Sequence, residues 1–270
     1  MENKQAIEIF EKGKAACEKQ DFATGLECFK QAADLGITPA MLGVGNIYHR
    51  GFGIKRDPVA AAEWYGKAGD AGLAAGYFNL GIMYLFEKGE DKPFPRSDEK
   101  ASEYFKKAEE LGDQNAAVRL AELYYSKNPE INNPEKGAAV LKKAADEGNV
   151  FAMVNLGQAY LEGKGLPRDE DKCFEWWLAA SKLGDPKAMF NLAGCYAVGR
   201  GTPPDLRLSY DWLKKSADLK LPEAVKQLAT LGWNTPNALK KVEGEEKKRQ
   251  DTLARQLSAL SGNIVAKKGE

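Results

Sequence analysis

The chain of 270 residues contains one histidine and four cysteines, so few side chains are available for metal binding or acid–base chemistry. His49 has no second histidine or cysteine at a metal-ligand spacing, and we interpret it as structural. The cysteines form no C-x-x-C motif and show no regular spacing, which favours buried small apolar residues. They are Cys17, Cys28, Cys173 and Cys195. The sequence therefore predicts no metal site and no cofactor.

A charge excess and a long apolar run are also missing. The 39 basic and 39 acidic residues balance, so no global field favours nucleic acid or an anionic membrane. No run of 18 apolar residues could form a membrane-spanning helix, and the first residues are charged where a signal peptide needs an apolar block. These features predict a cytoplasmic protein with neither a nucleic acid nor a membrane as partner.

Motifs that suggest catalysis have simpler interpretations. Three G-x-G triplets follow no strand pattern and lack the G-x-x-x-x-G-K-[ST] phosphate loop, so we interpret them as turns. Ser97 and Lys100 spell S-x-x-K, the nucleophile signature of penicillin-recognising enzymes. This segment begins a predicted helix, in which Ser97 caps the start and two acidic residues occupy the first turn. We predict no catalytic residue.

A period of about 36 residues dominates the sequence. Pairs of mostly bulky residues recur at intervals of 36, 40, 36, 36 and 36, and a tyrosine series keeps the same period. Such a period is typical of stacked supersecondary units. The pairs are Cys28-Phe29, Trp64-Tyr65, Tyr104-Phe105, Val140-Leu141, Trp176-Trp177 and Trp212-Leu213, and the tyrosines are Tyr48, Tyr84, Tyr124, Tyr160 and Tyr196. The longer interval predicts a four-residue loop insertion near residues 88–97.

Each unit is predicted to contain two helices. In the first helix a Gly or Ala lies three residues before the tyrosine, on one helical face with a leucine or valine. The second helix carries the bulky pair and ends at Gly36, Gly72, Gly112, Gly148 or Gly184, where glycine accepts a left-handed conformation. We expect every repeated Trp and Tyr to be core, so that loss of Trp64 or Trp176 costs about 3–5 kcal/mol.

The stretch from Ala40 to Gly72 contains A-x-x-x-V-G-x-x-Y-x-x-G-x-G-I-x-x-D followed by A-x-x-W-Y-x-K-A. It resembles the Sel-1-like repeat, a longer-looped relative of the tetratricopeptide repeat. The resemblance implies an all-α fold, a right-handed α-solenoid superhelix of antiparallel helix pairs.

The resemblance extends over about nine-tenths of the chain. We expect a tetratricopeptide-like helix pair at 1–37, five Sel-1-like repeats at 38–73, 74–113, 114–149, 150–185 and 186–221, and capping helices with a tail at 222–270. The third repeat is degenerate, because its loop lacks G-x-G.

A polar column on the first helices is the candidate binding site. The residue two before the Gly/Ala position is Gly43, Asn79, Arg119, Asn155 or Asn191, and the flanking column contains Asn46, Ile82, Glu122 and Gln158. Asn is a poor helix former, so propensity does not explain its recurrence. An amide can pair with a peptide backbone and an Arg with a carboxylate. We therefore predict peptide binding by Asn46, Asn79, Arg119, Glu122, Asn155, Gln158 and Asn191. The alternative is that these Asn residues hold neighbouring loops.

Peptide-binding tetratricopeptide proteins carry a carboxylate clamp, and this chain matches it only in part. Asn46, Asn79 and Arg119 occupy the matching Asn, Asn and Arg positions, whereas Leu42 and Asn115 occupy the two Lys positions. Without the two ammonium groups, we expect binding through an internal segment rather than a C-terminal carboxylate.

The segment after residue 222 departs from the period. Thr235 and Pro236 resemble a helix start, Gly244 interrupts the next helix, and Leu253, Leu257 and Leu260 form a stripe. We expect this stripe to cap the last first-type helix while residues 247–249 face water. Alternatively, the stripe stays exposed and pairs with a second chain or a partner helix.

Sel-1-like proteins act as adaptors, so the resemblance implies a non-enzymatic scaffold that binds proteins or peptides. Two alternatives remain open at this point. A few disulfide-rich relatives are reported as weak β-lactamases, which would make the chain a hydrolase. The C-terminal helix could also give a self-assembling structural protein.

Overall fold

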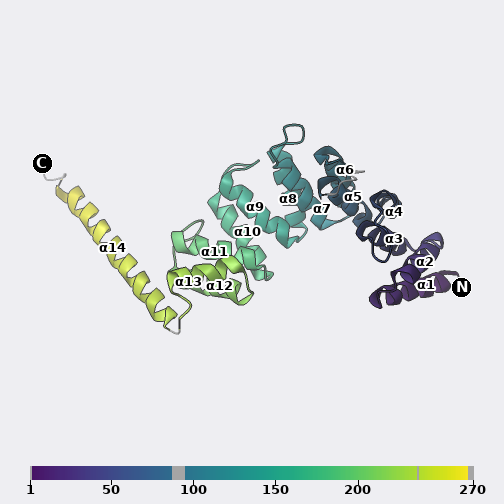
Figure 1. Ribbon diagram of the computed structural model, residues 1–270. Helices are drawn as coiled ribbons and strands as arrows, with labels where there is room; N and C mark the ends of the chain where they lie inside the picture. Colours follow the sequence, from purple (N-terminus) through teal and green to yellow (C-terminus); the bar gives the residue numbers. More distant parts are fainter. Residues whose placement is uncertain (1, 87–94, 236, 267–270) are drawn as a thin grey trace. The chain divides into compact units, whose positions relative to one another are not determined.

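The computed structural model describes residues 2–86, 95–235 and 237–266. Within these ranges it contains fourteen α-helices and no strand, which confirms the all-α solenoid of helix pairs (Figure 1). Two compact units divide the chain, Met1–Ala144 and Ala145–Glu270, called unit 1 and unit 2 below. None of the described helices has the length and apolar character that a membrane crossing requires.

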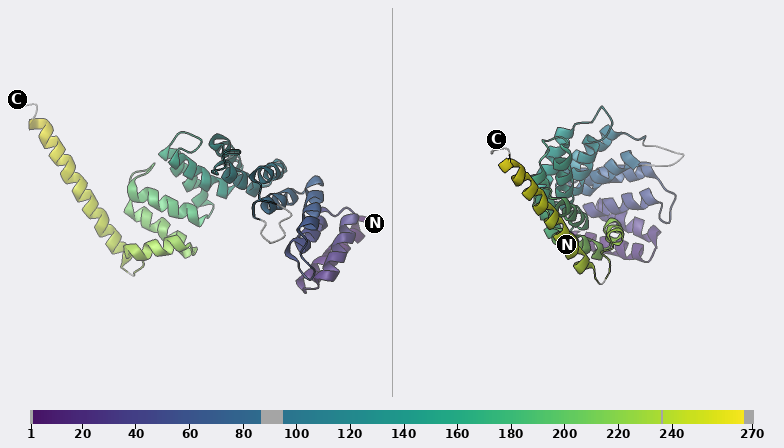
Figure 2. Two further views of the ribbon diagram at one scale, coloured as in Figure 1. Left: turned by 45° about the horizontal axis from the view of Figure 1, so that its top comes forward. Right: turned by 90° about the vertical axis from the view of Figure 1, so that its left-hand side faces the viewer.

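Unit 1 is built from helices that pack against their neighbours in the chain, from the first through the seventh. Figure 2 shows these pairs from two further directions. The helices are α1 (Glu2–Glu18), α2 (Phe22–Asp34), α3 (Thr38–Arg50), α4 (Pro58–Asp70), α5 (Ala74–Phe86), α6 (Asp98–Glu110), α7 (Gln114–Tyr124) and α8 (Pro134–Asp146).

Unit 2 repeats this arrangement. Each of its helices packs on the next from the ninth through the thirteenth, and the last helix packs on the twelfth. They are α9 (Val150–Glu162), α10 (Glu170–Lys182), α11 (Pro186–Val198), α12 (Leu206–Asp218), α13 (Pro222–Leu231) and α14 (Ala238–Ala266). We call the odd-numbered helices α1 to α13 A helices and the even-numbered helices α2 to α12 B helices.

The predicted ends of the B helices are confirmed. The five glycines expected there have φ between 86° and 93°. Lys220 lies one period after Gly184 and adopts φ 63° although it has a side chain. The left-handed turn is therefore a property of the repeat, and glycine adopts it at the lowest cost.

The loop between the A and B helices closes in the same way five times. The backbone N–H of the residue that caps the B helix donates to the carbonyl of the repeated tyrosine at 2.7–3.1 Å. These bonds run from Asp57 to Tyr48, Ser97 to Tyr84, Asn133 to Tyr124, Asp169 to Tyr160 and Asp205 to Tyr196. The G-x-G glycines of three loops have φ of 62–78°, as expected for turns. The predicted insertion falls mostly on residues 87–94, which lie outside the described residues.

The second residue of each bulky pair forms the core. Phe29, Tyr65, Phe105, Leu141, Trp177 and Leu213 are all buried. Trp64 and Trp176 are half-buried, and Trp64 packs against the core cluster around Phe29, so the prediction that they are core residues is confirmed only in part. Adjacent residues on a helix point about 100° apart, and only one of the two can face the A helix.

The tyrosine series is also less buried than expected. Tyr84 is buried, whereas Tyr48, Tyr124, Tyr160 and Tyr196 are half-buried. Lysine ammonium groups lie over several of the partly exposed rings, for example Lys67 over Trp64 and Lys215 over Trp212, both at 4.2 Å from the ring centroid. These aromatic rings therefore form the boundary between core and solvent.

The size of the small A-helix residue matches the size of its B-helix neighbour. A Cβ added at Gly45 or Gly81 would lie 2.6 Å from the ring of Tyr65 or Phe105, and one at Gly157 would lie 2.5 Å from Nε1 of Trp177. Two A helices that precede a B helix have Ala instead, and there the B-helix residue is a leucine. These pairs are Ala121 with Leu141 and Ala193 with Leu213. Glycine is thus needed where an aromatic ring packs closely against the A helix.

Three of the four cysteines are buried, and the histidine ring contacts a buried aromatic ring. Cys28, Cys173 and Cys195 are buried as predicted, but Cys17 is only half-buried, and all four are free thiols. Cys173 and Cys195 share one core cluster with Trp177. The His49 ring lies edge-on to the Tyr65 ring, with centroids 6.1 Å apart.

The C-terminal segment differs from the expectation in where its helix begins and in its continuity. The helix begins at Ala238 rather than at the predicted Thr235–Pro236, and it continues through Gly244 without interruption. Ala238 and Val242 are buried beside Trp233 and so cover the end of the solenoid. Pro236 lies outside the described residues.

Leu253, the one leucine of the stripe whose side chain lies in the described part of the chain, does not contribute to the cap. Leu253 is 56% exposed, and the side chains of Leu257 and Leu260 lie outside the described part of the chain. Arg249 was expected to face water with its neighbours, but its guanidinium donates to the carbonyl of Ala197 at 3.0 Å. The cap comes from the first two turns of α14, where Ala238 and Val242 pack into the last core cluster.

Candidate functional site

The polar columns lie on the surface of the A helices. In each helix from α3 to α13, the residues two before and one after the Gly/Ala position are exposed or half-buried. Residues three apart share one side of a helix. The A face of unit 1 consists of Gly43, Asn46, Asn79, Ile82, Arg119 and Glu122, and the A face of unit 2 consists of Asn155, Gln158, Asn191, Gly194, Gln227 and Thr230.

In unit 2 the side chains of successive A helices are within reach of one another. Lys187 on α11 and Glu223 on α13 occupy equivalent positions, 36 residues apart, and form an ion pair at 3.3 Å. The helices α11 and α13 therefore present one continuous surface at that point.

Asn46 has a structural role. The hydroxyl of the buried Tyr65 donates to its Oδ1 at 2.8 Å and lies 3.4 Å from Nδ1 of His49. A buried hydroxyl without a partner would be costly, so this contact stabilises the α3–α4 pair. For Asn46 this contact agrees with the alternative that the Asn residues stabilise the repeat rather than bind a peptide.

Arg119 is already paired within its own helix. Its Nη1 lies 2.8 Å from Oε2 of Glu122, and both side chains are about half exposed. Such an exposed pair contributes about 0–1 kcal/mol to stability. A ligand carboxylate can displace Glu122 at little cost, and a ligand cation can displace Arg119.

The amides of unit 2 are partly occupied by local contacts. Asn155 Nδ2 donates to the carbonyl of Phe151 at 3.0 Å, and Gln158 Nε2 donates to Glu162 at 2.6 Å. The side chains of Asn79 in unit 1 and Asn191 in unit 2 make no hydrogen bond to any described residue. These two amides have their full bonding capacity available.

The structure separates the seven predicted site residues by unit. Unit 1 holds Asn46, Asn79, Arg119 and Glu122, and unit 2 holds Asn155, Gln158 and Asn191. The two positions that hold Lys in the carboxylate clamp have no ammonium group in this chain. Leu42 packs against the apolar cluster around Tyr65, and Asn115 is exposed and uncharged.

Two residues beside the A face of unit 2 and one residue within it were not predicted. Phe151 is 61% exposed and Val198 is 63% exposed, on the same side of their helices as Asn155 and Asn191. Gly194 has open space where a Cβ would be. The spacing in the sequence could have located Phe151 and Val198. Phe151 precedes Asn155 by four residues and Val198 follows Asn191 by seven, and each spacing places its two residues on one side of a helix.

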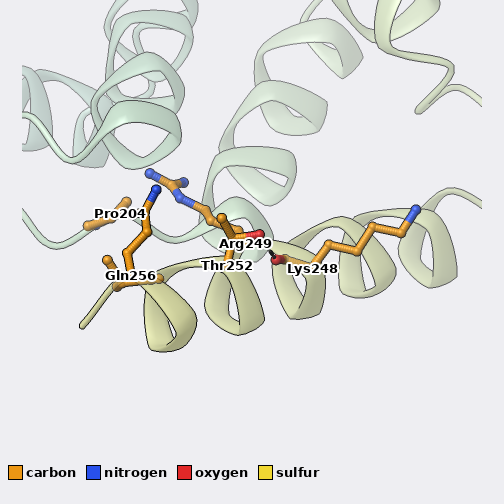
Figure 3. Close-up of a pocket in the computed structure, with 6 residues that line it drawn as sticks. Pro204, Lys248, Arg249, Thr252 and Gln256 are labelled. Atoms are coloured by element: carbon orange, nitrogen blue, oxygen red, sulfur yellow. Dashed lines mark hydrogen bonds between the residues drawn. The ribbon is translucent and has the colours of Figure 1, made fainter. Parts of the chain in front are cut away.

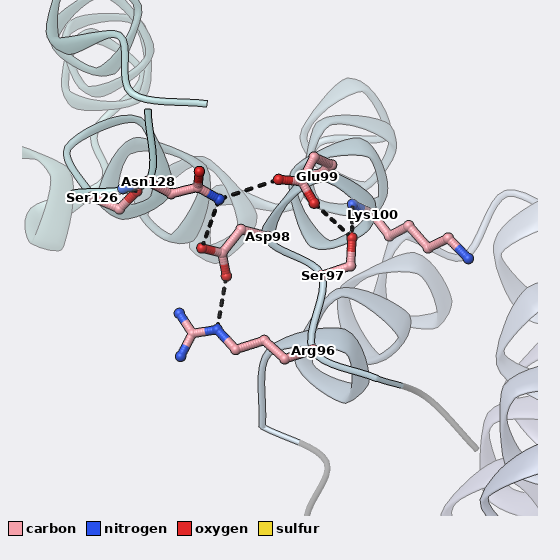
Figure 4. A network of polar contacts seen from close by, with 7 residues as sticks. All are labelled: Arg96, Ser97, Asp98, Glu99, Lys100, Ser126 and Asn128. Atoms are coloured by element: carbon pink, nitrogen blue, oxygen red, sulfur yellow. Dashed lines mark hydrogen bonds and ion pairs between the residues drawn. The ribbon is translucent and has the colours of Figure 1, made fainter. Parts of the chain in front are cut away.

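The S-x-x-K segment is a helix cap. Ser97 Oγ accepts from the Lys100 N–H at 3.2 Å and donates to Glu99 at 2.9 Å (Figure 4). The Lys100 ammonium lies 5.1 Å from the centroid of the Tyr84 ring. The lysine is therefore directed to the aromatic ring.

A polar network joins this helix start to the loop after α7. The Asn128 amide donates to both Asp98 and Glu99, and Arg96 pairs with Asp98 at 3.0 Å (Figure 4). Hydrogen bonds from its own backbone N–H and from Ser97 lower the pKa of Glu99, and a hydrogen bond with Glu99 raises the pKa of Glu130. No group of three His, Cys, Asp or Glu among the described residues could hold a metal.

A cavity of about 450 Å³ lies beside α14 (Figure 3). Pro204, Arg249, Thr252, Leu253, Gln256 and Lys248 line it. Arg249 and Gln256 reach toward Pro204 in Figure 3, whereas the Lys248 ammonium points away. With Arg249 bound to Ala197, this cavity offers few free polar groups.

The comparisons with known proteins agree on the kind of repeat. A family model described as Sel1 repeat matches residues 6–37, 38–73, 74–113, 114–149, 150–185 and 186–221. The first match covers the helix pair that resembles a plain tetratricopeptide repeat in sequence.

Solved structures share the fold. The chain is similar to c5321, a protective antigen of uropathogenic Escherichia coli strains that displays an SLR fold, with a TM-score of 0.71 and 24% identity. The match covers 88% of this chain and 51% of c5321, so the chain spans about half the length of that protein. It is also similar to a Sel1 repeat protein from Oxalobacter formigenes, with a TM-score of 0.59 and 24% identity over 72% of this chain and 76% of the other.

Proposed function

The chain belongs to the Sel1 repeat family, and from this premise we propose that it is a non-enzymatic scaffold that binds peptide segments of other proteins on its A faces. The observation that carries the proposal is the pair of uncommitted amides, Asn79 and Asn191, at equivalent positions of α5 and α11. An amide can donate to and accept from a peptide backbone of any sequence.

The charged residues of unit 1 give this binding its selectivity. Arg119 and Glu122 exchange their mutual ion pair for a ligand charge of either sign. Asn155 and Gln158 each keep a free carbonyl oxygen after their local contacts, so they accept from ligand N–H groups. A hydrolase is less well supported, because the Lys100 ammonium lies over Tyr84 and Ser97 caps a helix.

The test is affinity capture from extract of the native cells with the natural chain and with a triple variant, Asn79→Ala, Arg119→Ala and Asn155→Ala. We expect specific partners of the natural chain to be lost from the variant while helicity by circular dichroism stays the same. A matched control carries Glu63→Ala, Lys106→Ala and Glu175→Ala, three exposed residues of B helices. Retention of the same partners by the triple variant would rule the proposal out.

Self-association through α14 is a second candidate function. The exposed Leu253 favours it, since the first two turns of α14 already supply the cap. The test is light scattering on a chain that ends after Gly244, because this truncation keeps Ala238 and Val242 in place. An unchanged molar mass per particle, after correction for the deleted residues, would rule out self-association through α14.

A further inference from the structure

Large apolar side chains mark the two ends of the A face of unit 2. Phe151 lies in the first turn of α9 and Val198 is the last residue of α11, and each is more than 60% exposed. The positions equivalent to Phe151 in the other A helices hold Pro39, Ala75, Asn115, Lys187 and Glu223. The repeat therefore does not require an aromatic residue there.

Gly194 leaves the backbone of α11 bare in the middle of the same face. An added Cβ would meet nothing within 4 Å, and its φ is not positive. Glycine inside a helix costs about 1 kcal/mol relative to alanine, so neither packing nor backbone conformation explains it. A bare backbone does allow a ligand to approach closely.

The six residues that define this face carry no charge, and the Glu162 carboxylate at its edge keeps its charge because its partner Gln158 is neutral. The six residues are amides, a glycine and a threonine, and none is ionisable. At the edge of the face Lys187 is neutralised by Glu223 at 3.3 Å. The partner that complements the six residues in charge is an uncharged segment, because a buried unpaired charge would be costly.

We propose that the A face of unit 2 binds an extended, uncharged peptide segment of a partner protein. The segment crosses from Phe151 to Val198, its backbone pairs with Asn155 and Asn191, and a large apolar side chain lies over Gly194. Val198 follows Lys187, the position of α11 equivalent to Phe151, by eleven residues, which is a rise of about 16 Å at 1.5 Å per residue and corresponds to about five extended residues. This inference rests on the proposed function and specifies its ligand.

The test uses the full chain and a phage-displayed library of random ten-residue peptides. We expect the selected peptides to share an uncharged core of about five residues with large apolar side chains. Affinities of individual peptides are then measured by fluorescence anisotropy. Phe151→Ala removes an exposed aromatic anchor, and it should weaken binding about tenfold or more.

Gly194→Glu is the sharper variant, since it fills open space on the face without a clash in the fold. We expect it to weaken binding about tenfold or more, because it covers the bare backbone and adds an unpaired charge. The matched control is Gly66→Glu on α4, where an added Cβ also meets nothing within 4 Å. This control should bind as tightly as the natural chain.

The outcomes separate this inference from the proposed function. If no peptide is enriched, both are wrong. If peptides bind but respond to Asn79→Ala and Arg119→Ala rather than to Gly194→Glu, the inference is wrong and the proposed function stands. Selection of peptides with a charged core, or equal weakening by the Gly194 and Gly66 variants, also overturns the inference.

Discussion

The two units use the same core and present different surfaces. In both, a buried residue of the B helix packs on a Gly or Ala of the A helix, as for Tyr65 on Gly45 in unit 1 and Trp177 on Gly157 in unit 2. The A face of unit 1 contains the ion pair of Arg119 and Glu122, whereas the A face of unit 2 has no ionisable residue.

The difference follows from what the repeat constrains. A core position must fit its neighbours, because interiors are close-packed and a single methyl group matters. The A-face positions can vary without disturbing the core, apart from Gly43, where a Cβ would lie 2.8 Å from Phe29, and Asn46, which accepts from Tyr65. The units can therefore diverge in ligand preference without any change in fold, and substitutions in both units test this comparison.

The largest expected effect comes from the buried aromatic of unit 2. Trp177→Ala removes a side chain that is 2% exposed and donates to the Val154 carbonyl, so we expect a loss of about 3–5 kcal/mol in the free energy of unfolding. Trp176→Ala should cost about 1–2 kcal/mol, since that ring is half-buried. Urea unfolding followed by far-ultraviolet circular dichroism gives both values.

The same variant distinguishes the units. Trp64 is the one tryptophan of unit 1 and the other four are in unit 2, so fluorescence follows mainly unit 2 while circular dichroism follows both. We expect the fluorescence transition of Trp177→Ala to precede the circular dichroism transition, because repeats are stabilised by nearest neighbours. Coincident transitions would show that the two units unfold together.

The next effect tests the match between glycine and aromatic ring. Gly157→Ala places a Cβ 2.5 Å from Trp177 Nε1, and we expect it to cost about 1–3 kcal/mol despite the better helix propensity of alanine. Adding Trp177→Leu reproduces the Ala193–Leu213 pair and should remove the penalty of the alanine. A double-mutant cycle measures this coupling, and additive effects of the two substitutions would contradict the packing rule.

The fold could be predicted from the sequence because the contacts that define it recur in every repeat. The 36-residue period, the glycine stops and the Gly/Ala series each follow from contacts that recur in every unit, as the φ values of Gly36 and Gly184 confirm. The sequence did not distinguish Trp176 from Trp177, because the offset between neighbouring helices decides which of two adjacent residues faces the core. It also missed the continuity of α14 through Gly244, since packing on α12 outweighs the propensity of one residue.

The sequence predicted where the candidate site lies but not which partners its side chains bind. Periodicity located Asn46 and Asn155 on the surface, yet the bonds to Tyr65 and Phe151 depend on distances between side chains. Phe151 and Gly194 were missed because they interrupt the repeat, and a search for recurring residues passes over such positions. Binding by the seven predicted residues stays a prediction.

A smaller effect is expected when the charge pattern of unit 1 is moved to unit 2. Asn155→Arg with Gln158→Glu places an ion pair at the spacing of Arg119 and Glu122, and stability should change by less than about 0.5 kcal/mol. Binding of the uncharged peptides should weaken about tenfold, because two charges must lose water. The reciprocal change, Arg119→Asn with Glu122→Gln, should leave that affinity unaltered. Fluorescence anisotropy titrations measure these affinities. Equal effects of the two exchanges would mean that the units do not differ in ligand preference.

The smallest effect concerns one helix cap in each unit. Hydrogen bonds from Thr24 lower the pKa of Asp21, and the backbone N–H of Lys172 lowers the pKa of Asp169. A lowered native pKa means that the folded chain binds fewer protons than the unfolded chain. The stabilisation is therefore present above the unfolded pKa of about 3.9 and is lost as the pH falls through the native pKa.

Asn keeps the cap but does not titrate in this range, so Asp21→Asn and Asp169→Asn separate charge from geometry. Each natural carboxylate should stabilise its helix start relative to Asn near neutral pH through the helix dipole, and this advantage should vanish in acid. The measurement is the difference in urea midpoint between natural and variant chains from about pH 7 to about pH 2.5, a range that spans the unfolded pKa. A difference that stays constant over this range would show that the caps act through geometry alone, equally in unit 1 and unit 2.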